Sequence, residues 1–204
     1  MSRAVRRCGG AFLLLFLAAV VATTLGSVRI NLGHVLGILV SRLPGLGKLV
    51  EPTWPLAHEM IVLRVRLPRV LLALVVGGGL SVAGVLFQGS LRNPLADPYI
   101  IGVSSGASLG AAVGLLLVIP RGWVGHGFLP LFAFAGAVLA TLAVARLGQR
   151  RGRLEPTGLL LAGVAVGAFL TALVSLLMVL RIENLQDVYL WLMGSLSGRT
   201  WGHL

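Results

Sequence analysis

Five apolar runs dominate the sequence, and each has about the length that a helix needs to cross a lipid bilayer. A span takes about 20 residues, because a rise of about 1.5 Å per residue must cover a hydrocarbon core roughly 30 Å thick. A charge at the centre of a span costs about 2.5–3.5 kcal/mol, and only one charge, Arg146 at the edge of the fourth run, falls inside them. We therefore predict an all-α integral membrane protein, a polytopic helix bundle forming a single transmembrane domain over 1–204. The predicted spans are 11–28, 70–87, 100–119, 128–147 and 158–180.

The composition and the placement of charge agree with this class. Charged residues make up 11% of the chain and hydrophobic ones 57%, whereas soluble domains carry about 25% charged residues. The net charge of +11 comes from cations clustered between apolar runs without interleaved aromatic residues, which favours orientation in a bilayer over nucleic-acid binding. The densest cluster predicts a cytoplasmic loop, and counting back through four spans places the N-terminus in the cytoplasm as well. Its members are Arg146, Arg150, Arg151 and Arg153.

The first apolar run and two segments outside the spans need separate interpretation. Arginines precede the first run as in a signal peptide, but no clean cleavage site ends it, so we interpret it as an uncleaved helix. The segment 29–69 would lie outside the cell, and its "RLPGLGKLVEPTWP" predicts irregular structure with a short interfacial helix. After residue 180 an amphipathic stretch with Trp191 and Trp201 predicts a partial interfacial segment.

Residues 102–114, "GVSSGASLGAAVG", carry a glycine at every fourth position. The G-x-S-x-G within them fits a hydrolase elbow, but that device needs a strand-to-helix turn and a histidine partner, and all four histidines lie outside the apolar runs. A Walker A phosphate loop is excluded because the only lysine is Lys48. Positions four apart share one helix face, so a seam of close helix packing fits best. The predicted packing glycines are Gly102, Gly106, Gly110 and Gly114, with Gly163 and Gly167 in the fifth span.

Nothing in the sequence predicts a cofactor or an enzyme. Cys8 is the only cysteine, so it offers neither an internal disulfide nor a metal cluster. The pair His58-Glu59 does not extend to the H-E-x-x-H of a zinc hydrolase. We therefore expect no metal, no cofactor and no catalytic residue.

Four ordered motifs carry a family resemblance. They are R-x-P-R at 66–69, a Gly-rich helix with Gln88 near its end, N-P-L-A-x-P at 93–98, and G-x-S-x-G-A at 102–107. This pattern resembles the FecCD family of ABC-transporter permeases, which import iron-siderophores, haem and cobalamin. Later stretches, "LLLAGVAVGAFLTALVSLL" and "WLMGSLSGRTW", look like the family's fifth helix and the segment that follows it.

The resemblance implies the permease subunit of a type II ABC importer in the bacterial inner membrane. Such a subunit pairs with a second, identical or related, permease, two cytoplasmic ATPases that hydrolyse ATP, and an extracytoplasmic substrate-binding protein. Family permeases have ten spans and a later cytoplasmic coupling helix. The chain would therefore hold about the first half, as a fragment or a truncated product, and is not expected to transport alone. The alternative is an ion-coupled secondary transporter, but this class uses intramembrane carboxylates or broken helices, and no acidic residue lies in the five runs.

The resemblance also implies roles for single residues. Arg66 and Arg69 would bind acidic residues of the substrate-binding protein when it docks. The alternative is that both side chains only snorkel to the membrane interface at the start of a helix. Asn93 and Leu95 would form a cytoplasmic gate, or else an ordinary turn. Thr157 would belong to a second gate element, where Glu-Pro departs from the small hydroxyl residues of relatives.

The fifth predicted span would line the transport pathway. Thr171 and Ser175 are its hydroxyl side chains, on a face that is otherwise apolar and small. The transported chelate cannot be identified from these residues, because importers of siderophores, haem and cobalamin share the motifs.

Overall fold

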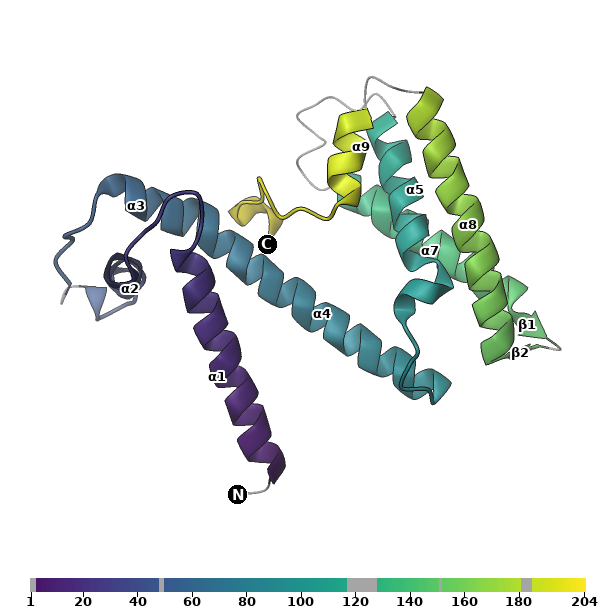
Figure 1. Ribbon diagram of the computed structural model, residues 1–204, viewed down its shortest axis with the longest axis horizontal. Coiled ribbons are helices and arrows are strands. Elements are labelled where there is room, and N and C mark those ends of the chain that lie inside the picture. The colour runs from purple at the N-terminus through teal and green to yellow at the C-terminus, as the bar shows by residue number, and fades with distance from the viewer. Residues whose placement is uncertain (1–2, 48–49, 117–127, 151, 181–184) are drawn as a thin grey trace. The chain divides into compact units, whose positions relative to one another are not determined.

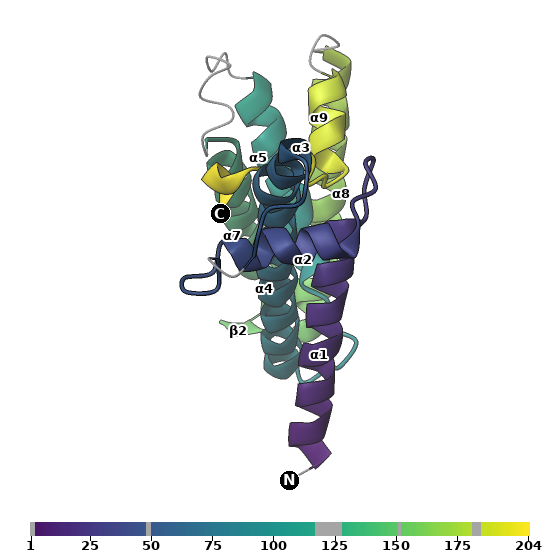
Figure 2. The same cartoon turned by 90° about the vertical axis from the view of Figure 1, so that its left-hand side faces the viewer.

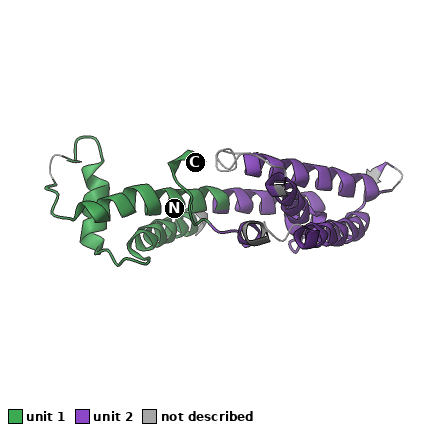
Figure 3. Ribbon diagram, turned by 90° about the horizontal axis from the view of Figure 1, so that it is seen from above, with its two compact units in different colours: residues 1–76, 196–204 green, residues 77–195 purple. Residues whose placement is uncertain are grey.

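The computed structural model describes residues 3–47, 50–116, 128–150, 152–180 and 185–204. The chain divides into two compact units, residues 1–76 with 196–204 and residues 77–195 (Figure 3). The boundary at 76/77 falls inside one helix, α4 (Leu67–Leu91).

The first unit is built from helices of very different length. It contains α1 (Arg3–Thr24), α2 (Leu32–Ser41), α3 (Leu56–Met60), the π-helix η2 (Ile61–Arg66), the start of α4 and the 3-10 turn η6 (Trp201–His203). Asn31 caps α2 by accepting a hydrogen bond from Gly33 N at 2.9 Å. As Figure 2 shows, α2 runs crosswise to α1. The apolar core of this unit consists of the buried residues Ile30, Val35, Ile38 and Val62.

The second unit is a helix bundle with one small hairpin. The helices α5 (Val103–Leu116), α7 (Leu129–Leu147) and α8 (Pro156–Leu180) pack together, with α9 (Leu185–Leu192) beside α5 (Figure 1). The 3-10 turn η3 (Pro98–Ile101) precedes α5. The antiparallel strands β1 (Gln149–Arg150) and β2 (Arg153–Leu154) join α7 to α8, with Gly152 at φ 74° between them. Ala111, Leu129 and Ala133 form the buried core.

The predicted all-α membrane class is confirmed. Four described helices are long and apolar enough to span a bilayer: Val5–Thr24, Leu56–Leu91, Leu129–Leu147 and Pro156–Leu180. The remaining predicted span, 100–119, is represented by α5 with 14 residues, and its predicted end lies outside the described residues. Two of its first residues, 100 and 101, belong to η3 rather than to the α-helix, since Gly102 adopts φ 79° and separates the two elements.

The prediction of irregular structure over 29–69 was wrong for residues 56–66. The short helix α2 is present, but residues 56–66 are helical and continue directly into α4. The prolines and glycines that suggested a loop end at Pro55, which becomes the N-cap of α3. From there to Leu67 the chain has neither glycine nor proline, so nothing breaks the helix.

Candidate functional site

The turn between α4 and η3 contains the predicted gate residues. Arg92 has φ 49°, and Asn93 Oδ1 accepts a hydrogen bond from Leu95 N at 2.9 Å. The buried Ala96 donates its backbone N–H to Asn93 O at 3.1 Å. These bonds fold the turn around Pro94 and leave the Leu95 side chain 86% exposed. Asn93 therefore shapes the turn, while Leu95 is free to contact another surface.

A cavity of about 610 Å³ opens beside this turn. Its walls come from the last turns of α4, the 94–99 segment and the start of α5. Leu80 and Gly84 give an apolar side, and the polar side chains are Gln88, Asp97, Tyr99 and Ser104. Asp97 also accepts a hydrogen bond from Tyr99 N at 2.9 Å. The sequence suggested Gln88 and Leu95 separately, but it gave no sign that Tyr99 and Ser104 share their cavity.

The predicted glycine seam lies against α7. A methyl group added at Gly106 would sit 2.5 Å from both Ala140 Cβ and Gly136 O, and one at Gly110 would sit 3.2 Å from Ala133 Cα. Gly136, which no motif or glycine period marks in the sequence, faces Gly106 and Gly110 in return. The backbones of α5 and α7 thus touch where both helices lack side chains.

The other predicted packing glycines behave differently from one another. A methyl group added at Gly114 would lie 3.1 Å from the Phe132 ring, whereas one at Gly163 would clash with the backbone carbonyl oxygen of Ile100. At Gly167 a methyl would find only Ser105 Oγ, at 3.6 Å, an ordinary contact. Gly102 lies before α5 and acts as the left-handed C-cap of η3. The packing seam of α5 therefore begins at Gly106.

The hydroxyl residues of α8 bond to their own helix. Thr171 Oγ1 donates to Gly167 O at 2.8 Å and Ser175 Oγ donates to Thr171 O at 3.1 Å, and both residues are exposed. Thr157 is exposed in the first turn of α8. Because the Thr171 and Ser175 donors are satisfied within the helix, the exposed face of α8 offers mainly apolar contact and weak acceptors.

Arg66 is a buried residue that closes the end of α1. It is 8% exposed, and its guanidinium donates to Thr23 O at 2.9 Å, to Thr24 O at 2.8 Å and to Val28 O. The last carbonyls of a helix have no partner within it, and a cation there also complements the helix dipole. Gly26 permits the approach, since a methyl group there would lie 2.9 Å from Arg66 Nη2.

The neighbouring arginines are placed differently. Arg69 is half-buried, and its Nε is a buried atom without a hydrogen-bond partner. Arg64 is exposed. Of the two predicted docking residues, Arg66 is already committed to α1, whereas Arg69 keeps an unpaired donor.

Pro68 of the R-x-P-R motif explains a long-range hydrogen bond between Trp201 and Leu63. In η2 Leu67 N donates to Val62 O, a bond that spans five residues. The carbonyl that would pair with residue 68 in this register is that of Leu63, but Pro68 has no N–H. Trp201 Nε1 donates to Leu63 O instead, at 2.8 Å. The indole therefore ties the 196–204 segment to the helix that carries R-x-P-R.

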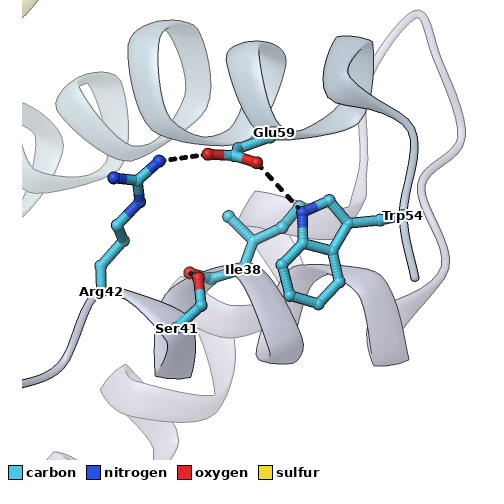
Figure 4. A network of polar contacts seen from close by, with 5 residues as sticks. All are labelled: Ile38, Ser41, Arg42, Trp54 and Glu59. Atoms are coloured by element: carbon cyan, nitrogen blue, oxygen red, sulfur yellow. Dashed lines mark hydrogen bonds and ion pairs between the residues drawn. The ribbon is translucent and has the colours of Figure 1, made fainter. Parts of the chain in front are cut away.

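A polar network joins α2 to α3 in the same unit (Figure 4). Glu59 accepts hydrogen bonds from Arg42 and, at 3.2 Å, from Trp54 Nε1. The Trp54 ring lies against Gly37, where an added methyl would come within 2.6 Å of it. Arg42 and Glu59 are 17 residues apart in the sequence, and no motif links them.

Fold and site together define a class: a polytopic helical membrane protein with small-residue helix packing and a cavity at a helix-to-helix turn. Residues 12–204 match the model of the FecCD transport family. The chain belongs to this family.

The sequence relatives of the chain are described as permease proteins. The chain is 38% identical over 195 residues to the uncharacterized ABC transporter permease protein YvrB of Bacillus subtilis, covering 95% of this chain and 54% of that protein. It is 45% identical over 150 residues to the Fe(3+) dicitrate transport system permease protein FecD of Escherichia coli, covering 72% and 45%. It is 41% identical over 147 residues to the cobalamin import system permease protein BtuC of Halobacterium salinarum, covering 72% and 39%.

A solved structure has the same fold. It is a metal-chelate type ABC transporter in an inward-facing conformation, with a TM-score of 0.67 and 30% sequence identity, covering 96% of this chain and 55% of that chain. The chain thus spans about half the length of the curated relatives and of the solved chain that it matches.

Proposed function

We propose that the chain forms part of the membrane pathway of an ABC importer for metal chelates of the iron-siderophore, haem or cobalamin type. The family match over 12–204 carries the proposal, and relatives named for ferric citrate and cobalamin import set the substrate class. No observation favours the ion-coupled alternative, since all six acidic residues lie outside the five apolar runs.

The partners follow from this class. A second permease subunit completes the pathway, cytoplasmic ATPases supply the energy, and a binding protein delivers the chelate. The permease itself catalyses no reaction. The orientation is that expected from the arginine-rich loop at 146–153, with this loop and the N-terminus in the cytoplasm of a bacterial inner membrane.

The 92–97 turn is proposed as the cytoplasmic gate. Leu95 projects an exposed apolar side chain, suited to closing against the equivalent residue of a second subunit. Asn93 holds the turn through its bond to Leu95 N. Thr157 lies at the start of α8, after the arginine-rich loop at 146–153. We propose it as the weaker second element of the gate. The exposed face of α8 with Thr171 and Ser175 is proposed to line the pathway, which suits bulky cargo held without a tight site.

Docking of the binding protein is proposed to rest on Arg69, with Arg66 fixing the helix that presents it. Charges across such a surface mainly steer association and set orientation. The commitment of the buried Arg66 to the end of α1 supports this division, and so does the only partial burial of Arg69.

Co-purification tests the proposal directly. The chain would be co-expressed with the second half of the permease, an ATPase and a binding protein of the importer, and the complex would be isolated through the tagged chain in mild detergent. We expect the ATPase to co-purify and ATP hydrolysis to rise when chelate-loaded binding protein is added. Absence of the ATPase from complexes formed with the full set of permease helices would overturn the assignment.

Docking and gating need separate variants. Arg69→Glu should weaken capture of the loaded binding protein at low salt, whereas Thr171→Val should leave capture unchanged. In a Cys8→Ser background, which removes the exposed native thiol, Leu95→Cys should react less readily with a thiol reagent added from the cytoplasmic side when a second subunit closes the gate. Equal reactivity with and without the second subunit would exclude Leu95 from the gate.

A further inference from the structure

Two histidines from separate helices meet in the first unit. His34, in the first turns of α2, and His58, in α3, have their Nδ1 atoms 3.2 Å apart and their ring centroids 5.4 Å apart. Both side chains are half-buried. The transport proposal gives this pair no role.

The two backbones are held in place by other contacts. Ile38, one turn after His34 on the same helix face, is fully buried in the core with Val62. On α3, Glu59 follows His58 directly and bonds to Arg42 and Trp54 (Figure 4). The histidines are therefore brought together by a core and a polar network that do not depend on them.

We propose that His34 and His58 form a two-histidine chelate for a late first-row divalent cation such as Zn²⁺, Ni²⁺ or Cu²⁺. Imidazole is a preferred ligand of these metals. Two nitrogens bound at about 2.0–2.1 Å around a tetrahedral ion lie about 3.3 Å apart, close to the separation of the two Nδ1 atoms. The metal replaces the proton shared between the rings, and side-chain rotation turns the two lone pairs toward one point.

The site is an open one. Among the described residues no group of three histidine, cysteine or acidic side chains is placed to hold a metal. Two protein ligands leave coordination positions for water or for donors of another molecule, unlike the four protein ligands of a structural zinc site. An occupied site links α2 to α3. It is separate from the chelate cargo, whose iron or cobalt travels already coordinated.

Metal titration of the purified chain tests this site. The chain would carry a histidine-free affinity tag and be placed in lipid nanodiscs, and Co²⁺ and Zn²⁺ would be titrated with absorption and calorimetric readouts. We expect one ion per chain. His34→Ala and His58→Ala should each weaken binding about a hundredfold, because the second imidazole acts at the effective concentration set by the fold. His203→Ala is the matched control, since His203 lies in η6 and its Nδ1 accepts a hydrogen bond from Thr200 N at 3.2 Å.

A second measurement distinguishes a metal ion bound by both histidines from ions bound at unrelated surface positions. Zn²⁺ should slow amide hydrogen exchange in 32–41 and 56–60 of the unsubstituted chain, and in neither histidine variant. Circular dichroism confirms that the variants stay helical. Equal binding by the unsubstituted chain and both variants would overturn the proposal, as would no binding at all, which would leave the pair as a simple N–H···N hydrogen bond. Neither result bears on co-purification with an ATPase, so the transport proposal stands or falls separately.

Discussion

The two compact units join apolar helices by different means. In unit 2 the α5 and α7 backbones touch along Gly106, Gly110 and Gly136. In unit 1 a single guanidinium, that of Arg66, bonds to the last two carbonyls of α1 and to Val28 O just beyond the helix. Lipid gives no hydrophobic drive for helix association, so helices depend on van der Waals contact between small residues or on polar bonds. The glycine seam fixes two helices along several turns, whereas the arginine fixes one point.

This difference shows in how much of each helix is covered. The most apolar 18-residue stretch of α1, in unit 1, contains no buried residue, whereas those of α7 and α8, in unit 2, are 17% and 11% buried. A helix held at one end leaves its length open to lipid or to other helices. Substitutions should therefore have larger effects in the seam than at the polar contacts, and the following predictions test this order.

Gly110→Leu should have the largest effect. The new side chain would meet the backbone of α7 at Phe132 and Ala133, and overpacking typically costs about 1–3 kcal/mol, occasionally more. Because backbone cannot move aside as a side chain can, we expect about 3 kcal/mol lost from the free energy of unfolding, measured by thermal or denaturant unfolding in detergent. Gly78→Leu in α4, where an added methyl meets nothing within 4 Å, is the control. Similar losses in both variants would show that the seam carries no special packing.

Arg66→Met should come next. It removes the donor of two carbonyls at the end of α1 and of Val28 O beyond it while keeping an apolar side chain, and hydrogen bonds to charged groups are worth about 1.5–3 kcal/mol. We expect a loss of about 2 kcal/mol and faster amide exchange at 21–28. Arg66→Lys should not restore stability, because an ammonium lacks the planar fork. The exposed Arg64→Met serves as control, and a loss there as large as that of Arg66→Met would contradict the structural role.

Trp201→Phe should have a smaller effect. The substitution keeps an aromatic ring but removes the N–H that satisfies Leu63 O, and a neutral hydrogen bond contributes about 1 kcal/mol. Hydrogen exchange should become faster in 196–204, with little change in overall stability. Trp191→Phe makes a matched comparison, because Trp191 packs on the core of the other unit. If exchange at 196–204 stayed unchanged in Trp201→Phe, the indole bond would not hold this segment.

Glu59→Gln should have the smallest effect. The Arg42 side chain is 61% exposed and the Glu59 side chain 22%, and ion pairs near solvent add little. The amide oxygen of the substituted side chain would still accept the Trp54 bond. We expect no measurable shift of the unfolding transition at low or at high salt. A shift larger than that of Trp201→Phe would invert the proposed order.

Much of the fold could be predicted because spanning a bilayer imposes a length and forbids charge. Four of the predicted spans correspond to long helices, and the glycine period of α5 indicated a packing face. The partner of that face could not be predicted, since Gly136 is a single glycine in "FAFAGAVLA" with no period of its own. A seam can be identified from one helix, but its counterpart depends on which helix lies opposite.

The polar contacts could not be predicted from the sequence, for a different reason. Trp201 and Leu63 are 138 residues apart. Their bond also depends on the π-helical register of η2, in which Pro68 leaves the carbonyl of Leu63 unpaired, rather than the carbonyl of residue 64 as in an α-helix. Arg66 and Arg69 share one motif, yet one is buried and the other half-buried. Sequence shows that three arginines stand near a proline, but not which of them points toward the end of α1.

The unbroken helix from Leu56 to Leu91 has a consequence for what reaches the histidine pair. Its uncharged stretch, 70–91, measures about 33 Å at about 1.5 Å per residue and by itself fills the hydrocarbon layer. The preceding turns must then project into water, which places His58 roughly 18 Å from residue 70 along the helix axis. A membrane-impermeant chelator should accordingly strip a metal from this pair when added on that face of a sealed vesicle, and leave it in place from the other.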